Sequence, residues 1–410
     1  MDHSTTIESL RSRFPQAVGP PRTPGSVATA TPHSPQQAAE MARCLSEAGV
    51  GVFPTGSPAA SRKEVRAAGW VALSTERLTR IISHDPRDLT VEVEAGVTVA
   101  ALNETLAAAG QHLPVDPPLP ERTTVGELIA GNGSGPLRFG HGTVRDFILS
   151  LRVVLPDGRL VKSGARVAKN TAGLDVHRLF VGSRGSLGLV TAASFRVRPV
   201  PERFAAVLLH PPDGSTARLW LDRLMLGAVR PVFLELLNSR AAAQLHIEAP
   251  LGAWLLAVGL VGSARNVEWQ MEYLAGEFGE RSMRLEAAEA RELYEAVRDW
   301  PARDHAVGFA ASVPSAEVVA LVEEAAWSPL SVIAHAGNGV VVARGGPAVA
   351  DEALRPVFDF VMRVGGSLRL TRASAGLQLP RWAGRSHDLE LMRRVKSVFD
   401  PAGLFNPLPF

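Results

Sequence analysis

Hydrophobic residues in the first half of the chain recur at spacings that distinguish helices from strands. After Ser34–Pro35, apolar residues follow at helical spacing until Gly49, which predicts a capped helix. The segment 90–96 alternates between polar and apolar residues as a strand does, and 99–110 returns to helical spacing. Pro, Asp and Gly at 156–158 separate two apolar runs and predict a hairpin. This half therefore mixes helices and strands.

The second half carries longer apolar segments of both kinds. We expect strands near 204–209, 231–237, 253–261, 306–312, 331–334, 340–344 and 367–371. We expect helices near 217–226, 264–278, 287–299, 315–326 and 348–364, and a last amphipathic helix ending at Asp400. These elements predict a fold of the α+β class. The resulting division is a flexible, Pro/Ser/Thr-rich arm at 1–31, domains at 32–201 and 202–390, and a C-terminal segment at 391–410.

Composition narrows the class of protein. The 410 residues, 46% of them hydrophobic, suffice for two soluble domains. The 43 basic and 41 acidic residues are interspersed, which argues against a nucleic-acid partner. Cys44 is the single cysteine, so no intrachain disulfide or cysteine-based cluster is expected. The longest apolar stretch, 251–262, is too short to span a bilayer. We expect a cytoplasmic protein, at most peripheral to the inner face of a membrane.

Small residues gather between Lys169 and Gly188, around one apolar turn. Glycine and serine allow a ligand to approach the backbone and leave amide groups free for phosphate or carbonyl oxygens. Such a segment predicts a nucleotide site, although alone it is equally typical of a loop rich in turns.

Four segments together indicate a family. They are 73–82, 93–118, 123–158 and 169–191, and the tail 395–407 (VKSVFDPAGLFNP) adds a fifth match. In composition, order and separation they resemble the PCMH-type FAD-binding domain of vanillyl-alcohol oxidase, D-lactate dehydrogenase and bacterial glycolate oxidase subunits. The resemblance implies two small subdomains that enclose FAD, an α+β cap domain over the reactive ring, and a tail that returns to the FAD domain.

The resemblance also implies roles for individual residues. It assigns cofactor contacts to Pro54, Thr55, Gly56, Ser57, Pro117, Thr124, Val125, Gly126, Gly131, Gly133, Ser134, Gly135, Arg138, Gly140, Gly182, Ser183, Gly185, Val190 and Asn406. It further implies that Val144, Arg145 and Asp146 help to close the site. Taken singly, each glycine is also consistent with an ordinary turn, and Arg145 and Asp146 with a structural ion pair.

The first phosphate loop departs from the family pattern. Relatives carry a run of glycines here, whereas this chain continues after Gly56 with Ser57, Pro58 and two alanines. Proline has no N–H to offer a pyrophosphate, so weakened or lost FAD binding is one hypothesis. The first loop has no histidine and Cys44 lies outside the matched segments, so the resemblance implies noncovalent FAD.

A second site of interest is VIAHAGNGVVV around His335. Relatives acting on D-2-hydroxyacids carry H-x-G-x-G-N-x-H, whose histidines help to hold a metal; Val340 and Val342 stand at the last two signature positions here. We therefore expect no metal. His335 is either a base that accepts the substrate hydroxyl proton or a strand-end histidine bonded to backbone.

The altered signature resembles that of the shorter FAD-binding subunit of bacterial glycolate oxidase. This resemblance implies oxidation of glycolate, or another small 2-hydroxyacid, in a complex with a homologous catalytic flavin subunit and an iron-sulfur subunit. Two alternatives stay open. One is a self-sufficient FAD-dependent 2-hydroxyacid or alcohol dehydrogenase, and the other is a noncatalytic subunit whose flavin site has decayed.

Overall fold

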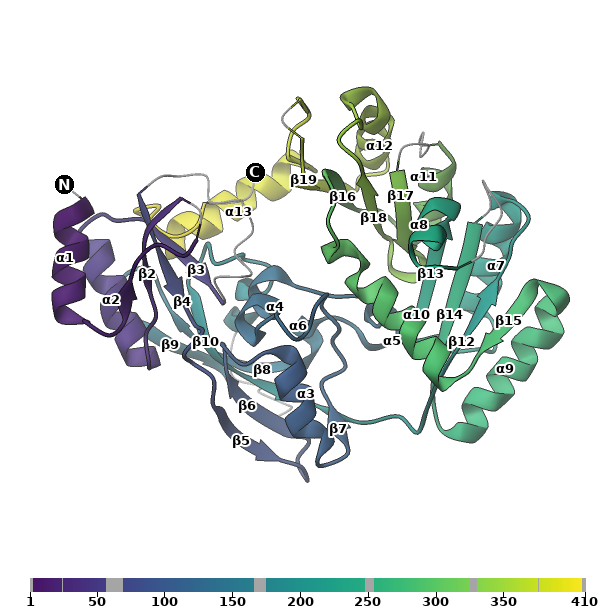
Figure 1. The fold of residues 1–410 in the computed structure, drawn as a ribbon, viewed down its shortest axis with the longest axis horizontal. Helices are drawn as coiled ribbons and strands as arrows, with labels where there is room; N and C mark the ends of the chain where they lie inside the picture. Colours follow the sequence, from purple (N-terminus) through teal and green to yellow (C-terminus); the bar gives the residue numbers. More distant parts are fainter. Residues whose placement is uncertain are drawn as a thin grey trace. The chain divides into compact units, whose positions relative to one another are not determined.

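The computed structural model describes residues 3–23, 25–56, 69–165, 175–247, 254–324, 330–374 and 376–407. The chain divides into two compact units (Figure 1). The first comprises the residues up to Ser134, then Thr143–Val200 and the segment from Glu390. The second comprises Gly135–Gly142 and Pro201–Leu389.

One layer of the first unit is a small sheet with strand order β1-β2-β4-β3, in which β2, β4 and β3 are parallel. The bounds are α1 (His3–Arg13), β1 (Val18–Gly19), β2 (Ser26–Ala30), α2 (Pro35–Glu47), β3 (Val52–Thr55) and β4 (Trp70–Ser74). The predicted helix is confirmed in α2: the Ser34 side chain accepts a hydrogen bond from the Gln37 N–H, and Pro35 is the first helical residue.

The described residues between 3 and 31 form a helix and two strands, where the sequence suggested a flexible arm at 1–31. Ile7, Leu10 and Phe14 of this region are buried in the same core as α2. Their helical spacing was present in the sequence, but the surrounding Pro, Ser and Thr residues obscured it. The strand β2 pairs with β4, so the sheet begins before residue 32.

The other layer of the first unit is an antiparallel sheet with order β5-β6-β10-β8-β9. Its strands are β5 (Ile81–Asp85), β6 (Thr90–Glu94), β8 (Ile148–Val154), β9 (Leu160–Gly164) and β10 (Leu189–Arg196). The helices are α3 (Val99–Ala107), α4 (Val125–Gly131), α6 (Val144–Phe147) and a 3-10 turn η1 (Val176–Phe180), and β7 (Gln111–His112) pairs with β11 (Arg198–Pro199). Side chains of α3 and α4 share one hydrophobic core with this sheet.

The second unit is built on one antiparallel sheet with order β15-β12-β14-β13-β17-β18-β16-β19-β20. Its strands are β12 (Arg203–Leu209), β13 (Phe233–Asn238), β14 (Trp254–Gly262), β15 (Ser282–Leu285), β16 (Val307–Ser312), β17 (Leu330–His335), β18 (Val340–Gly345), β19 (Ser367–Arg372) and β20 (Trp382–Ala383). Its α-helices are α5 (Arg138–His141), α7 (Gly214–Leu226), α8 (Ser239–Gln244), α9 (Ala264–Phe278), α10 (Ala287–Asp299), α11 (Val318–Glu324) and α12 (Asp351–Arg363). The helix α13 (Ser386–Phe399) leads back to the first unit.

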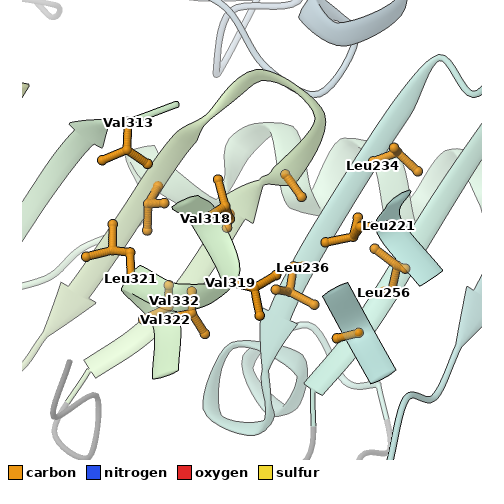
Figure 2. Packing of buried hydrophobic residues seen from close by; sticks show 14 of the residues in the cluster. Leu221, Leu234, Leu236, Leu256, Val313, Val318, Val319, Leu321, Val322 and Val332 are labelled. Carbon is orange, nitrogen blue, oxygen red and sulfur yellow. The ribbon is translucent and has the colours of Figure 1, made fainter. Parts of the chain in front are cut away.

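Helices cover both faces of this sheet, and strand periodicity decides which residues meet them. In β13, Leu234 and Leu236 pack in the core shared with α7, α9, α11 and α12 (Figure 2). The alternate residues Phe233 and Leu237 pack in the other core, with α8 and α10. Because both faces are buried, the strands are apolar almost throughout, and Glu235 in β13 is an exception that the site below explains.

Among the described residues, no helix combines the length and apolar character needed to cross a membrane. The helices predicted at 264–278 and 287–299 are confirmed with those bounds in α9 and α10. The predicted hairpin at 156–158 is also confirmed, because β8 and β9 pair antiparallel and Gly158 has a positive φ of 82°.

Candidate functional site

The start of α4 is held to the neighbouring strand layer through its own amides. Thr124 and Glu127 form a capping box: the Glu127 N–H donates to the Thr124 hydroxyl at 3.2 Å, and the Thr124 N–H donates to the Glu127 carboxylate at 3.0 Å. The N–H of Val125 donates to the Val97 carbonyl, and that of Gly126 to the Ala95 carbonyl, both at 2.8 Å. In this arrangement these amides bond the helix to the segment that follows β6, and they are not free to bind a phosphate.

The end of β3 lies against this helix cap. A Cβ at Gly56 would lie 2.2 Å from the Thr124 hydroxyl oxygen, so only glycine allows the two segments to approach this closely. The Gly56 carbonyl accepts a hydrogen bond from the buried Ser74 hydroxyl. Pro54 and Thr55 belong to β3 itself. Ser57, Pro58 and the two alanines that follow lie outside the described residues, and so does 166–174 of the segment rich in small residues.

The end of α4 contacts the second loop rich in small residues. Helix α4 ends at Gly131, and Asn132 follows in the left-handed conformation with φ 49°. The N–H groups of Gly182 and Arg184 donate to the carbonyls of Ile129 and Ala130, at 3.0 and 2.8 Å. The loop at 182–188 is thus attached to the carboxyl end of α4, whose orphan carbonyls need such donors.

Two further close approaches complete this part of the first unit. A Cβ at Gly133 would lie 3.2 Å from the Pro117 Cβ. A Cβ at Gly185 would lie 2.9 Å from the Pro54 Cβ, and Gly185 has a φ of +75°. The loop at 182–188 therefore contacts β3 directly.

The side chains of Ser183 and Val190 are both used in contacts within the first unit. The Ser183 hydroxyl donates to the Phe180 carbonyl at 2.8 Å. The Val190 side chain is buried in the core of the antiparallel sheet. Both side chains therefore contribute to packing within the first unit.

The predicted contact residues divide between the two units. Gathered around α4 in the first unit are Pro54, Thr55, Gly56, Pro117, Thr124, Val125, Gly126, Gly131, Gly133, Gly182, Ser183, Gly185 and Asn406, with Ser134 at the edge of that unit. Gly135, Arg138 and Gly140 belong to the second unit. There the Gly140 N–H donates to the Val232 carbonyl at 2.9 Å, and a Cβ at Gly140 would lie 2.7 Å from the Val232 Cα.

Four buried polar side-chain atoms of the first unit lack a hydrogen-bond partner among the described residues, and two of them are the Thr75 hydroxyl and the side-chain oxygen of Asn132. Asn132 lies beside Gly182, where a Cβ would be 3.6 Å from the Asn132 Cβ. Thr75 directly follows the parallel strand β4, and its N–H donates to the Thr55 carbonyl. Buried polar groups are rarely left unpaired, so these two atoms fit a polar ligand at this end of the sheet.

Sequence reasoning named neither Thr75 nor Asn132 as a site residue. The available signal was Thr75 in the matched segment 73–82, at the carboxyl end of a strand. Ligands of α/β sheets commonly bind outside the carboxyl ends of parallel strands. The sequence does not show that β4 is parallel to its neighbours. That orientation follows only from the strand pairing in the structure.

A separate polar site lies in the second unit, where the buried side chains of Glu235 and His335 meet. The two residues are paired across β13 and β17 and lie on the same face of the sheet. The His335 Nδ1 lies 2.9 Å from one carboxylate oxygen of Glu235 and 2.7 Å from the other. Burial raises the pKa of Glu235, and the charge of His335 opposes that shift.

This geometry gives His335 a side-chain partner that the sequence did not predict. The partner of its Nδ1 is the carboxylate of Glu235, rather than the backbone group that we considered as the alternative to a catalytic role. Three residues after His335, in the 3-10 turn η5 (Ala336–Asn338), the amide nitrogen and oxygen of Asn338 are buried without a partner among the described residues. A Cβ at Gly337 would lie 2.3 Å from the Phe139 ring, so this turn packs closely against α5.

Val340 and Val342 stand in β18, where Val340 is paired with His335 and Val342 with Ile333. In the described part of the chain, no cluster of three or more His, Cys, Asp or Glu side chains has the arrangement of a metal site.

Comparison with known proteins agrees with this arrangement. Residues 27–164 match the FAD binding domain family, and residues 378–409 match the C-terminal domain of FAD linked oxidases. The chain is similar to glycolate oxidase subunit GlcD of Bacillus subtilis, with 25% identity over 83% of this chain and 79% of that subunit. It is also similar to glycolate oxidase subunit GlcE of Escherichia coli, with 39% identity over 30% of this chain and 35% of that subunit.

Among solved structures, alkyldihydroxyacetonephosphate synthase has a similar fold, with a TM-score of 0.74 at 17% identity over 98% of this chain and 86% of that one. The predicted α+β architecture with a PCMH-type FAD-binding domain is therefore confirmed. The two family matches, at 27–164 and 378–409, and the named relatives show that the chain is an FAD-linked oxidoreductase and that its cofactor is FAD.

Proposed function

We propose that this chain is the FAD-binding subunit of an enzyme that oxidises a small 2-hydroxyacid, with glycolate as the first candidate and glyoxylate as its product. The similarity to two glycolate oxidase subunits supports the substrate class. The observation that carries the reaction type is the buried pair of Glu235 and His335, because oxidation of an alcohol to a carbonyl must release the hydroxyl proton to a base.

The pair is suited to accept that proton. With Nδ1 directed at the Glu235 carboxylate, His335 takes the substrate proton at Nε2, and the buried carboxylate stabilises the imidazolium that results. Asn338 supplies an amide whose two polar atoms lack protein partners among the described residues, and it orients a hydroxyl or carboxylate oxygen. FAD, when bound, supplies the acceptor for the two electrons and the hydrogen that leave the substrate carbon.

Of the residues gathered around α4, those of β3, of α4 and of the loop at 182–188 would hold FAD noncovalently. Gly56 and Gly133 allow the segments that would line the cofactor site to pack closely against Thr124 and Pro117. The Thr75 hydroxyl and the Asn132 side-chain oxygen are the polar groups that FAD would pair with.

The electrons must then leave the subunit. A chain with one cysteine cannot ligate an iron-sulfur cluster through cysteines, so a partner would carry the clusters, together with a homologous catalytic flavin subunit. We place the complex in the cytoplasm, at most peripherally at the membrane.

The experiment is a visible spectrum of the purified, FAD-loaded chain, recorded before and after anaerobic addition of glycolate, D-lactate or a simple alcohol, alone and with the candidate partner subunits. Loss of the oxidised flavin bands with glycolate only when the partners are present supports the proposed subunit. Loss with the chain alone supports a self-sufficient dehydrogenase. A chain that binds FAD and is never reduced, even in the complex, would overturn a catalytic role.

A further inference from the structure

The carboxyl end of α13 carries a half-buried, fully paired lysine. The Lys396 ammonium donates to the Asp400 carboxylate at 2.6 Å, to the Ser186 carbonyl at 2.9 Å and to the Phe405 carbonyl at 3.3 Å. Its side chain is 13% exposed and that of Asp400 is 1% exposed. An ammonium group has three N–H bonds, and here each has an acceptor.

Asp400 orders the turn that follows the helix. Its two carboxylate oxygens accept hydrogen bonds from the N–H groups of Leu404 and Phe405, at 3.0 and 2.8 Å. The chain therefore reverses after Pro401 and brings Phe405 into the core of the parallel sheet, where its side chain is fully buried.

The reversed segment then continues the parallel sheet beside β3. The Val52 N–H donates to the Leu404 carbonyl at 2.7 Å, and Val52 and Phe405 form a parallel bridge. Two residues after Val52, the same strand reaches Pro54, which contacts Gly185. We call Lys396, Asp400, Leu404, Phe405 and Asn406 the C-terminal clasp.

The clasp also holds the loop at 182–188. The amide nitrogen of Asn406 donates to the Arg184 carbonyl at 2.7 Å, and Lys396 bonds the Ser186 carbonyl of the same loop. Arg184 has a φ of +53°, a conformation that non-glycine residues rarely adopt and that needs outside support. The clasp is therefore bonded both to β3 and to the loop at 182–188.

We propose that the C-terminal clasp sets the spacing between β3 and the loop at 182–188 and that its docking is thermodynamically coupled to FAD binding. Lys396 and Asn406 are then positioning residues: Asn406 acts on the cofactor site through Arg184, and not by touching FAD as the sequence suggested. Coupling between two binding events is reciprocal, so FAD must also hold the clasp in place. The proposal rests on FAD as the cofactor and is independent of the substrate.

A purely structural tail would behave differently. Removing its contacts would lower the stability of the first unit without changing FAD affinity in the fraction that stays folded. The deciding measurement is therefore the dissociation constant of FAD for folded apoprotein, from the change in flavin fluorescence, alongside circular dichroism and the thermal midpoint of each variant.

The variants are Lys396→Met, Lys396→Arg and Asn406→Ala. The matched control is Arg393→Met, which removes a positive charge from an exposed position on the same helix. We expect Lys396→Met to weaken FAD binding about tenfold and Asn406→Ala about fivefold, within the usual range of coupling between sites. Lys396→Arg should recover part of the loss, and the control should bind as wild type.

The reciprocal effect is measured by trypsin, which can release the tail after Arg394 once α13 undocks. We expect saturating FAD to slow release of the fragment beginning at Val395 in wild type, with less effect in Asn406→Ala. If Lys396→Met does not fold, Asn406→Ala decides, because it removes one hydrogen bond. FAD affinity of folded Asn406→Ala within about twofold of wild type would overturn the proposal, as would tail release that FAD leaves unchanged.

Discussion

The guanidinium carbon of Arg344 lies 4.5 Å from the centroid of the Trp300 ring, and both residues are buried in the second unit. The same guanidinium donates hydrogen bonds to the Trp300 and Asp304 carbonyls. Burial lowers the pKa of Arg344 to about 10. The Arg344 guanidinium therefore stabilises the turn after α10 through contacts with two backbone carbonyls and an aromatic face.

Replacing Arg344 should cost much more stability than replacing an exposed arginine on an aromatic ring. In Arg344→Met the Trp300 and Asp304 carbonyls lose their donor, and we expect the free energy of unfolding to fall by about 3 kcal/mol. The control is Arg363→Met, because Arg363 lies 4.9 Å from the Phe360 ring but is exposed; we expect about 0.5 kcal/mol there. Urea unfolding measures both, and equal losses would contradict a special role for Arg344.

A second prediction concerns the contact between the loop at 182–188 and β3. Gly185→Ala forces a side chain into a left-handed conformation and to within 2.9 Å of the Pro54 Cβ, so we expect a loss of about 2 kcal/mol. Gly276→Ala is the opposite case, because a Cβ at Gly276, inside α9, meets nothing within 4 Å. We expect it to stabilise the protein by about 0.5 kcal/mol through helix propensity.

Both variants are measured by thermal and urea unfolding under the same conditions. Gly185→Ala should also weaken FAD binding, since Gly185 lies in the loop that the C-terminal clasp holds. A Gly185→Ala protein as stable as wild type would show that the contact with Pro54 relaxes without cost.

Local patterns predicted elements well where one periodicity covered a whole segment. The bounds of α9 and α10 follow from their apolar stripes and caps, as at Ser263, whose hydroxyl accepts from the Asn266 N–H. Short strands such as β4 were missed, because five residues buried between two strands carry no alternation.

The candidate site could be predicted only as far as the resemblance reached. Gly56 and Gly126 were predicted as cofactor contacts, but their contacts with Thr124 and Ala95 depend on the packing of distant segments. Glu235 was not predicted at all, since it meets His335 across a separation of 100 residues that only the strand pairing closes. Tertiary contacts of this kind leave no local periodicity in the sequence.

The proton held by the Glu235 and His335 pair predicts a pH effect on stability. The pKa of Glu235 is raised by burial from its ordinary value of 4.5, so the folded protein keeps a proton that the unfolded chain loses above that value. The contribution of this carboxyl to stability is thus fully present below pH 4.5 and is lost as the pH rises through the folded pKa.

Glu235→Gln removes this titration while keeping a carbonyl that accepts from His335. We expect wild type to lose stability relative to Glu235→Gln as the pH rises above 4.5, by at most about 1.4 kcal/mol per pH unit. Urea unfolding of both proteins at several pH values gives the difference. A difference that does not change with pH would mean that the carboxyl titrates alike in the folded and unfolded states.

The last prediction tests His335 as the proton acceptor. In His335→Gln the side chain keeps a polar contact with Glu235 but loses the ring nitrogen that takes the substrate proton. We expect the rate of flavin reduction at saturating 2-hydroxyacid to fall by about 100- to 1,000-fold, with FAD affinity unchanged. The control is His305→Gln, since His305 bonds the Arg303 carbonyl and has no place in the proposed chemistry. Stopped-flow absorbance of the FAD-loaded complex supplies the rate. An unchanged rate in His335→Gln would assign His335 a purely structural role, because a buried histidine bonded to a carboxylate can stabilise a sheet without taking part in a reaction.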